Sequence, residues 1–277
     1  MTEGKYRYIV SSDLDGTLLS PGEVLSPENT EAIRRMKDEG VCFVPNSGRT
    51  FAEMPRVVLE NPDIRYYIGA DGSAIWDKET NTRAEICMSR ERVSKVFDLL
   101  DSYKTSSTVR NKGVSYCDIE KNNGEEYKKY RIGKLYGEFI DYYVRKVDNF
   151  DELIRSFENV EMICAFFADD GEMEECKRRI EALGDFSVAS SEPTNIEIFH
   201  KNAGKGSALL MLADMLGVAH EKTVAVGDSK NDLDMIKKAG ISLAMENATD
   251  EIKEAADMTI CHYTEHSAKY ILENIIK

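Results

Sequence analysis

Residues 9–19 read IVSSDLDGTLL, an apolar run that stops at two aspartates and continues into a Gly-Thr turn. Alternate side chains of an extended chain point to the same side, so we expect Asp13 and Asp15 to converge at the end of a strand over residues 7–12. Two carboxylates at that separation need a metal ion, a basic side chain or a shared proton. The alternative is an ordinary polar turn, because Asp and Gly are common turn residues.

A second apolar run also stops at an aspartate. Residues 223–232 read TVAVGDSKND, which predicts that Asp228 follows another buried strand. Open parallel sheets bind ligands at the C-terminal ends of their strands, so Asp13, Asp15 and Asp228 can meet there. Oxygen ligands without His or Cys suit a hard cation such as Mg²⁺, which also binds substrate phosphate. These three acids are therefore candidate metal ligands.

The composition narrows the class of protein. The 277 residues, 42% of them hydrophobic, can form one large or two modest domains. A formal net charge of −14 argues against a nucleic-acid partner, because a basic face supplies most of that affinity. No signal peptide or membrane-spanning run is visible, and six widely spaced cysteines are typical of reduced thiols. We expect a cytoplasmic protein that does not bind a membrane.

Strand and helix patterns alternate at both ends of the chain. This alternation predicts an α/β fold, a doubly wound, Rossmann-like parallel sheet formed by residues 1–77 and 192–277, with NIEIFH at 195–200 among its strands. Residues 78–191 differ and are predicted to be an inserted α+β domain, because their strands alternate apolar and polar residues. The basic, aromatic stretch 128–146 is interpreted as an amphipathic helix packed on that sheet.

Two further segments offer groups that suit phosphate. The strand that starts at Val41 ends in Asn46-Ser47-Gly48-Arg49, which presents a hydroxyl and backbone N–H groups to an anion. Lys205 stands just before a helix expected at 207–216, so its ammonium can face a phosphate or a nucleophile. The surrounding residues do not form a P-loop, because the chain before Gly204 lacks the first Gly that this motif requires. A nucleoside triphosphate ligand therefore loses support.

In their order along the chain, these four segments resemble the motifs of the haloacid dehalogenase superfamily, and in particular its Cof-like phosphatases. SDLDGTLL from Ser12 resembles the first motif and NSGR from Asn46 the second. Lys205-Gly206 resembles the third, and GDSKND from Gly227 the fourth. The insert is similar to the family's α+β cap domain, which sets substrate specificity. The resemblance extends over nearly the whole chain.

The resemblance implies a role for each matched position in catalysis. Asp13 would be the nucleophile, Asp15 the general acid/base and Lys205 the cation that stabilises charge. Asp13, Asp15 and Asp228 would hold Mg²⁺. The phosphoryl group would be bound by Ser47, Gly48, Lys205 and Asn231, with support from Thr17, Arg49 and Asp232. Thr17 is expected to fix the turn around Asp15 through its hydroxyl rather than to react.

The expected function is that of a phosphoric monoester hydrolase. It would use Mg²⁺ and an aspartyl-phosphate intermediate to hydrolyse small phosphorylated metabolites, sugar phosphates among them. A phosphomutase of the same superfamily and a non-catalytic metabolite-binding regulator are the alternatives. One departure limits transfer from relatives: Asp71-Gly72 stands where they often carry Asn-Gly, so an acid replaces an amide.

Overall fold

The computed structural model describes residues 6–276, which fall into two compact units. The first unit contains the chain up to Gly48, then Met54–Ala84, and everything from Gly204 onward. The second contains Arg49–Glu53 and Glu85–Ala203. Within residues 6–276, no helix combines the length and the apolar composition that crossing a bilayer requires.

The first unit is built from short strands, α-helices and 3₁₀ turns. In chain order its elements are β1 (Tyr8–Ser12), α1 (Pro27–Asp38), β2 (Val41–Pro45), α2 (Arg56–Leu59), β3 (Tyr66–Gly69), η1 (Ala70–Gly72), β4 (Ala74–Asp77), β5 (Thr82–Glu85), α8 (Lys205–Leu216), η2 (His220–Lys222), β14 (Thr223–Gly227), η3 (Lys230–Asp232), α9 (Leu233–Lys238), β15 (Ile241–Ala244), α10 (Asp250–Ala255), β16 (Met258–Thr259), η4 (Tyr263–Glu265) and α11 (Ser267–Asn274).

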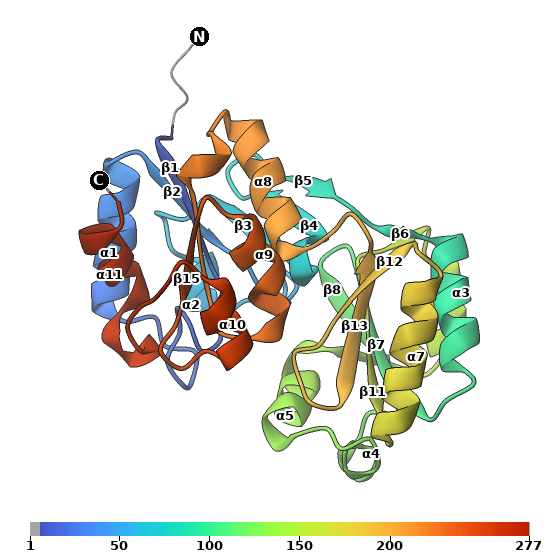
Figure 1. Cartoon of the computed structure of the whole chain (residues 1–277). Helices are drawn as coiled ribbons and strands as arrows, with labels where there is room; N and C mark the ends of the chain where they lie inside the picture. The colour runs from blue at the N-terminus through green and yellow to red at the C-terminus, as the bar shows by residue number, and fades with distance from the viewer. Residues whose placement is uncertain (1–5, 277) are drawn as a thin grey trace. The chain divides into compact units, whose positions relative to one another are not determined.

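A parallel sheet with helices on both faces forms the core of this unit. Its strand order is β16-β15-β14-β1-β2, and every neighbouring pair is parallel. Helices α1 and α11 lie together on one face, and α8, α9 and α10 lie on the other (Figure 1). The doubly wound α/β fold predicted from the alternating pattern is therefore confirmed, and it brings the C-terminal ends of β1, β2 and β14 to one edge.

Local sequence signals explain where α1 begins and ends. Ser26 caps the helix, because its hydroxyl oxygen accepts a hydrogen bond from the Asn29 N–H at 3.1 Å. Pro27 occupies the first helical position, where a missing N–H costs nothing. Gly40, just beyond the end, has a φ of 72°. These are the start and stop residues that the sequence predicted.

The third predicted strand does not extend the parallel sheet as a regular strand. β3 pairs antiparallel with β4 in a separate three-stranded sheet that also contains β5. A single parallel bridge, Asn46 to Ile68, connects it to the residue that follows β2. A short, fully buried strand has the same apolar pattern in either pairing, so the sequence could not show this difference.

The second unit is an α+β structure. In chain order it contains β6 (Met88–Ser89), α3 (Arg90–Leu100), β7 (Thr105–Asn111), β8 (Val114–Asp118), α4 (Gly124–Lys129), α5 (Lys134–Tyr143), β9 (Arg145–Val147), α6 (Phe150–Ser156), β10 (Asn159–Val160), β11 (Met162–Phe167), α7 (Asp170–Ala182), β12 (Phe186–Ala189) and β13 (Asn195–His200). Its main sheet has six strands in the order β12-β13-β11-β7-β8-β9.

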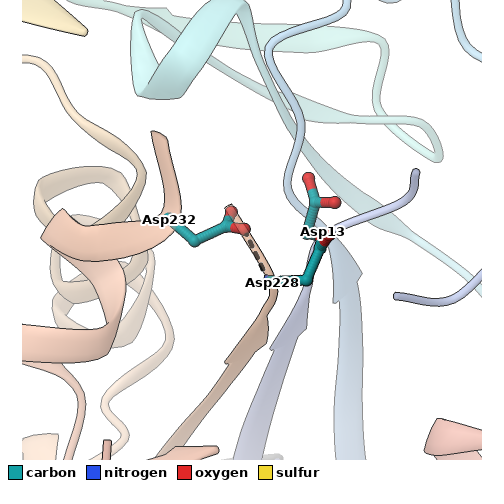
Figure 2. A group of neighbouring side chains, drawn as sticks. All are labelled: Asp13, Asp228 and Asp232. Carbon is teal, nitrogen blue, oxygen red and sulfur yellow. Dashed lines mark hydrogen bonds between the residues drawn. The ribbon is translucent and has the colours of Figure 1, made fainter. Parts of the chain in front are cut away.

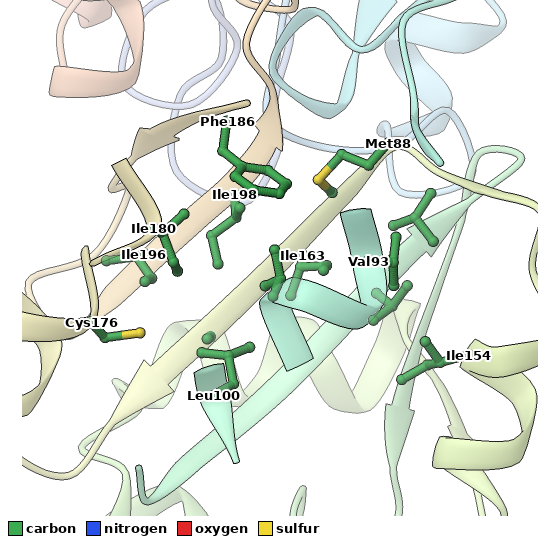
Figure 3. Packing of buried hydrophobic residues seen from close by; sticks show 14 of the residues in the cluster. Met88, Val93, Leu100, Ile154, Ile163, Cys176, Ile180, Phe186, Ile196 and Ile198 are labelled. Atoms are coloured by element: carbon green, nitrogen blue, oxygen red, sulfur yellow. The ribbon is translucent and has the colours of Figure 1, made fainter. Parts of the chain in front are cut away.

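Two hydrophobic clusters hold this second unit together. The larger one joins buried side chains of α3 and α7 to the sheet, with Ile163, Ile180 and Ile198 fully buried (Figure 3). The smaller one joins α4 and α5 to the sheet around Tyr127 and Phe166. Apolar residues spaced three and four apart on each helix produce these contacts.

The structure places two parts of the chain differently from the sequence prediction. Residues 195–200, expected in the core, form β13, which pairs antiparallel with β11 and β12 in the second unit. The compact units consequently divide after Ala84 and Ala203, rather than at residues 77/78 and 191/192. Almost all of β13 is buried. A buried strand has the same apolar residue pattern in a parallel core and in the centre of an antiparallel sheet, so the sequence could not show which sheet it joins.

The stretch 128–146 is not one amphipathic helix. It contains the end of α4, all of α5 and the start of β9. The break lies at Tyr130–Gly133, where Arg131 has a φ of 54°. Helix α5 nevertheless buries Ile140 against the second unit, as an amphipathic helix packed on a sheet would.

Candidate active site

Asp13 follows β1 directly, because the fully buried run Tyr8–Ser12 ends there. Its backbone N–H donates to the carbonyl of Val226 at 3.0 Å, which extends the pairing between β1 and β14 by one residue. Only 5% of Asp13 is exposed. The carboxylate therefore lies at the edge of the sheet in surroundings with little water.

Asp228 follows β14 on the neighbouring strand, and Thr17 holds it in place. The Thr17 hydroxyl donates to Asp228 Oδ1 at 3.0 Å. Gly16, with a φ of 77°, permits the approach, since a Cβ atom there would lie 2.7 Å from Asp228 Oδ2. The Thr17 hydroxyl thus binds the Asp228 carboxylate, whereas the prediction was that it fixes the turn around Asp15.

Lys205 is fully buried and faces two carboxylates. Its Nζ donates to Asp13 Oδ1 at 2.7 Å and to Asp232 Oδ1 at 2.6 Å. The residue is the first of α8, not the residue before it, because the helix starts two positions earlier than expected. Asp234 secures that start, since its Oδ2 accepts from the N–H groups of Gly206 and Ser207.

Asp232 connects the ammonium to the loop that follows β14. Its Oδ2 accepts from the backbone N–H groups of Asp228 and Ser229 at 2.9 and 3.0 Å, and the residue is fully buried. Figure 2 shows Asp13 and Asp228 at the ends of neighbouring strands, with the Asp232 carboxylate beside them. Hydrogen bonding to two N–H groups fixes the position of the Asp232 carboxylate.

Three carboxylates form a group that can hold a metal ion. One oxygen each from Asp13, Asp228 and Asp232 lies within 4.8 Å of the others. The predicted ligand Asp15 has an exposed side chain and lies outside this group. Asp232, predicted only in a supporting role, stands in the group instead, because the turn η3 brings it back toward β14.

Burial and mutual repulsion dominate the electrostatics here. Burial raises the pKa of Asp13 well above its ordinary value; Lys205 opposes that shift, while Asp232 and Asp228 add to it. Burial and the charge of Asp232 raise the pKa of Asp228 to about 6. Burial lowers the pKa of Lys205, but attraction by Asp13 and Asp232 outweighs it, so the net pKa lies well above the usual value. Crowding of the carboxylates thus disfavours their ionised forms, and Lys205 offsets only part of this effect.

The loop after β2 lies at the same sheet edge. Ser47 is 3% exposed, and its N–H donates to the Ile68 carbonyl at 3.0 Å. Asn46 positions this loop, since its amide donates to Ser11 Oγ at 2.9 Å and to the Lys205 carbonyl at 3.0 Å. No role was predicted for Asn46 alone, although its place just before Ser47 was a signal.

Arg49, predicted to support the phosphate site, belongs to the second compact unit. Its guanidinium lies over the rings of Phe139 and Tyr143, at 5.3 and 5.8 Å from their centroids. It also donates to the Glu53 carbonyl at 3.1 Å. These contacts give Arg49 a packing role inside that unit.

Asn231 and Asp71 complete the surroundings of the first unit's site. Asn231 accepts a hydrogen bond from Ser229 Oγ at 2.7 Å, and its amide nitrogen lies 3.5 Å from Asp71 Oδ1. Asp71 is only 1% exposed. Asp71 stands out in the sequence as a departure from related sequences, but it was not among the predicted site residues.

Comparison with known proteins agrees with this geometry. The family of haloacid dehalogenase-like hydrolases matches residues 10–272. The 5-amino-6-(5-phospho-D-ribitylamino)uracil phosphatase YcsE of Bacillus subtilis is 30% identical, over 90% of this chain and 88% of its own length. A second B. subtilis phosphatase named for the same substrate, YwtE, is 29% identical over 96% of this chain and 97% of its own length.

A solved structure supports the same relationship. The haloacid dehalogenase-like hydrolase from B. subtilis superposes with a TM-score of 0.84 at 27% identity, covering 97% of this chain and 100% of that chain. The match thus spans both compact units. The chain therefore belongs to the haloacid dehalogenase superfamily and is a phosphatase of its Cof-like branch.

Proposed function

We propose that this phosphatase hydrolyses phosphate monoesters of small metabolites through an aspartyl-phosphate intermediate on Asp13, with Mg²⁺ as its cofactor. The observation that carries the proposal is the placement of Asp13: a buried carboxylate at the sheet edge, fixed through Oδ1 by Lys205 Nζ at 2.7 Å. Its other oxygen, Oδ2, would attack phosphorus. The relatives named as ribitylaminouracil phosphatases support a small phosphorylated metabolite as substrate.

The donor set fits a magnesium ion. Three carboxylates within 4.8 Å of one another and one ammonium leave a charge of −2 when all four are ionised (3 × −1 and +1), which a divalent cation balances. All the candidate donors are oxygens, as a hard cation prefers. We assign side-chain ligation to Asp13 and Asp228, because the Asp232 oxygens already accept hydrogen bonds from Lys205 and two backbone N–H groups. When bound, Mg²⁺ would polarise a phosphoryl oxygen and offset its charge.

The remaining chemistry belongs to the chain's own residues. Asp13 Oδ2 forms a bond to phosphorus while the bond from phosphorus to the leaving oxygen breaks, and Asp15 gives that oxygen a proton. In the second half, Asp15 takes a proton from water as the water oxygen attacks phosphorus, and the bond to Asp13 breaks. An exposed Asp15 side chain suits this work, because it must exchange protons with the leaving group and water.

Binding of the phosphoryl oxygens is assigned to the groups around Asp13. Lys205 Nζ, the Ser47 hydroxyl, the Gly48 N–H and the Asn231 amide all belong to the first unit and follow or flank its strands. Donors fixed by the fold cost no reorganisation when charge develops on the phosphoryl group. Asp232 supports them by holding Lys205 in place.

The second unit is proposed to act as the cap domain that selects the leaving group. The residues assigned to phosphoryl transfer all lie in the first unit, so recognition of most of the substrate requires other groups. Replacing Glu85–Ala203 by a short linker should change the ranking of metabolite phosphates more than the hydrolysis of 4-nitrophenyl phosphate. An unchanged ranking in a folded variant would place selectivity in the first unit alone.

The deciding experiment measures phosphate release from 4-nitrophenyl phosphate and a panel of phosphorylated metabolites. We expect turnover with Mg²⁺, none with EDTA, and recovery when Mg²⁺ is returned in excess. Acid quenching of Asp15→Asn during turnover of a ³²P-labelled substrate should trap label on the protein. Full activity in EDTA would contradict the metal assignment. If Asp15→Asn turned over slowly enough to be quenched during the reaction and released phosphate without any labelled protein, the covalent intermediate would be contradicted.

A further inference from the structure

The turn that carries Asp71 has an unusual backbone. Ala70, Asp71 and Gly72 follow one another with φ values of 49°, 48° and 84°. The left-handed region costs free energy for residues with a Cβ atom, and successive residues in it are rare. Conformations of this kind persist where the surrounding structure holds them, and they concentrate at functional sites.

The surrounding structure does hold this turn. The Asp71 N–H donates to the Ser47 carbonyl at 3.2 Å. Gly72 packs against the start of α8, where a Cβ atom would lie 2.1 Å from the Gly204 carbonyl oxygen and 2.8 Å from Lys205 N. The turn is thus fixed between two segments assigned to phosphoryl binding, and the direction of the Asp71 side chain is fixed with it.

The Asp71 carboxylate is buried beside these segments. Its Oδ1 is 3.5 Å from the Asn231 amide nitrogen, a long contact. Its Oδ2 is buried and has no hydrogen-bond partner among residues 6–276. Both oxygens lie over Gly48, since a Cβ atom built there would be 3.2 Å from Oδ1 and 3.4 Å from Oδ2. A buried carboxylate oxygen without a donor is costly unless a ligand supplies one.

The chemistry of the site limits what that ligand group can be. A carboxylate only accepts hydrogen bonds, and so do phosphoryl oxygens, so Asp71 and a bound phosphate cannot satisfy each other without a shared hydrogen. Lys205 donates two of its three ammonium hydrogens to Asp13 and Asp232, and the third is assigned to a phosphoryl oxygen. A donor group carried by the substrate itself would satisfy this oxygen of Asp71. An asparagine at this position could instead turn an N–H group toward a phosphoryl oxygen.

We propose that Asp71 is a specificity-determining residue: its carboxylate accepts a hydrogen bond from a hydroxyl group near the phosphoester and thereby selects phosphorylated polyols and sugars over esters without hydroxyl groups. This inference rests on the proposed phosphatase function. The same oxygen could be satisfied by a protonated phosphoryl oxygen, but that donor is present in every phosphate monoester and gives no selectivity. A matched pair of substrates separates the two sources.

The test compares ribitol 5-phosphate with pentyl phosphate, which has the same chain length and no free hydroxyl. In Asp71→Asn we expect the ratio of the two kcat/KM values to fall about 10-fold or more relative to wild type. Asparagine tolerates the left-handed conformation and replaces one of the two acceptor oxygens by an NH₂ donor. Asp71→Gly tolerates the same conformation and has no side-chain acceptor at all, so its ratio should fall at least as far. Asp38→Asn, which removes one charge from the exposed end of α1, is the control and should leave the ratio unchanged.

The outcomes separate this inference from the function beneath it. If the ratio of the two kcat/KM values stayed within twofold of wild type in folded Asp71→Asn and Asp71→Gly, Asp71 would not determine specificity. The hydrogen bond to Asp71 would then come from the phosphoryl group that both substrates share. If the wild-type protein released no phosphate from either ester or from 4-nitrophenyl phosphate with Mg²⁺, the phosphatase proposal itself would fail. A loss of activity that is equal for both esters also counts against substrate selection by Asp71.

Discussion

At the scale of single residues, the site depends on charges that hold one another in place. Lys205 is buried together with the carboxylates of Asp13 and Asp232, and each partner would be costly to bury alone. Thr17 in turn holds Asp228. Substitutions here should therefore separate the chemistry of a side chain from its support of a neighbour.

The first residue-scale prediction concerns Asp13. Asp13→Asn should remove measurable turnover, because an amide of nearly the same shape cannot attack phosphorus usefully. Phosphate release measures the loss, and a thermal melt checks that the fold persists. Hydrolysis near the wild-type rate in a pure sample would show that another group is the nucleophile.

The second concerns Thr17. Thr17→Val keeps the shape but removes the hydrogen bond to Asp228, so the Mg²⁺ concentration for half-maximal activity should rise about 10-fold, as expected for a group that orients a metal ligand. Thr17→Ser keeps the hydroxyl and should stay close to wild type. Titration of activity with Mg²⁺ measures both. Equal requirements in the valine and serine variants would mean that this hydroxyl does not position Asp228.

At the scale of elements, short strands are held at their ends by side chains. The β3–β4 hairpin is an example, because Arg65 donates to both carboxylate oxygens of Asp77, at 3.0 and 2.7 Å. Asp77 Oδ1 also accepts from the Glu79 N–H at 3.0 Å. The hydrogen bonds from Arg65 first, and then those from Thr80, lower the pKa of Asp77 against the opposing effect of burial.

The third prediction follows from that lowered pKa. The folded protein binds a proton at Asp77 less readily than the unfolded chain does. The ionised carboxylate therefore stabilises the fold fully above the ordinary aspartate pKa of about 4, and this stabilisation is lost as the pH falls through the lower pKa that Asp77 has in the folded state. At pH 7, Asp77→Asn should reduce the free energy of unfolding by about 1–2 kcal/mol. Urea titrations at pH 7 and pH 3 measure the difference. A destabilisation of equal size at both pH values would exclude the ionised carboxylate as its source.

At the scale of the whole molecule, two separate sets of core residues support the two compact units. Ile163 is fully buried in the larger cluster of the second unit, and Ile33 is fully buried on α1 in the first. Each unit therefore has its own source of hydrophobic stabilisation.

The fourth prediction uses this separation. Ile163→Ala should destabilise the second unit by about 2–5 kcal/mol, because the lost side chain leaves a cavity in a packed core. Hydrogen exchange should then speed up in Glu85–Ala203 and stay unchanged in the first unit. Ile33→Ala is the matched control, with the opposite pattern expected. Faster exchange of similar size in both units for either variant would show that they unfold together.

The sequence by itself determined the parallel sheet, the bounds of α1, and the ends of β1 and β14, where Asp13 and Asp228 stand. These features follow from local signals: an apolar run that stops at a polar residue, and a Ser-Pro start with a glycine stop. Only the tertiary structure decided which sheet takes residues 195–200, because buried strands look alike in sequence. The tertiary structure alone brought Asp232 beside Asp13 and left the Asp15 side chain exposed. It also buried Asp71 against Gly48. The reason is that contacts between distant segments are fixed by packing and not by local pattern.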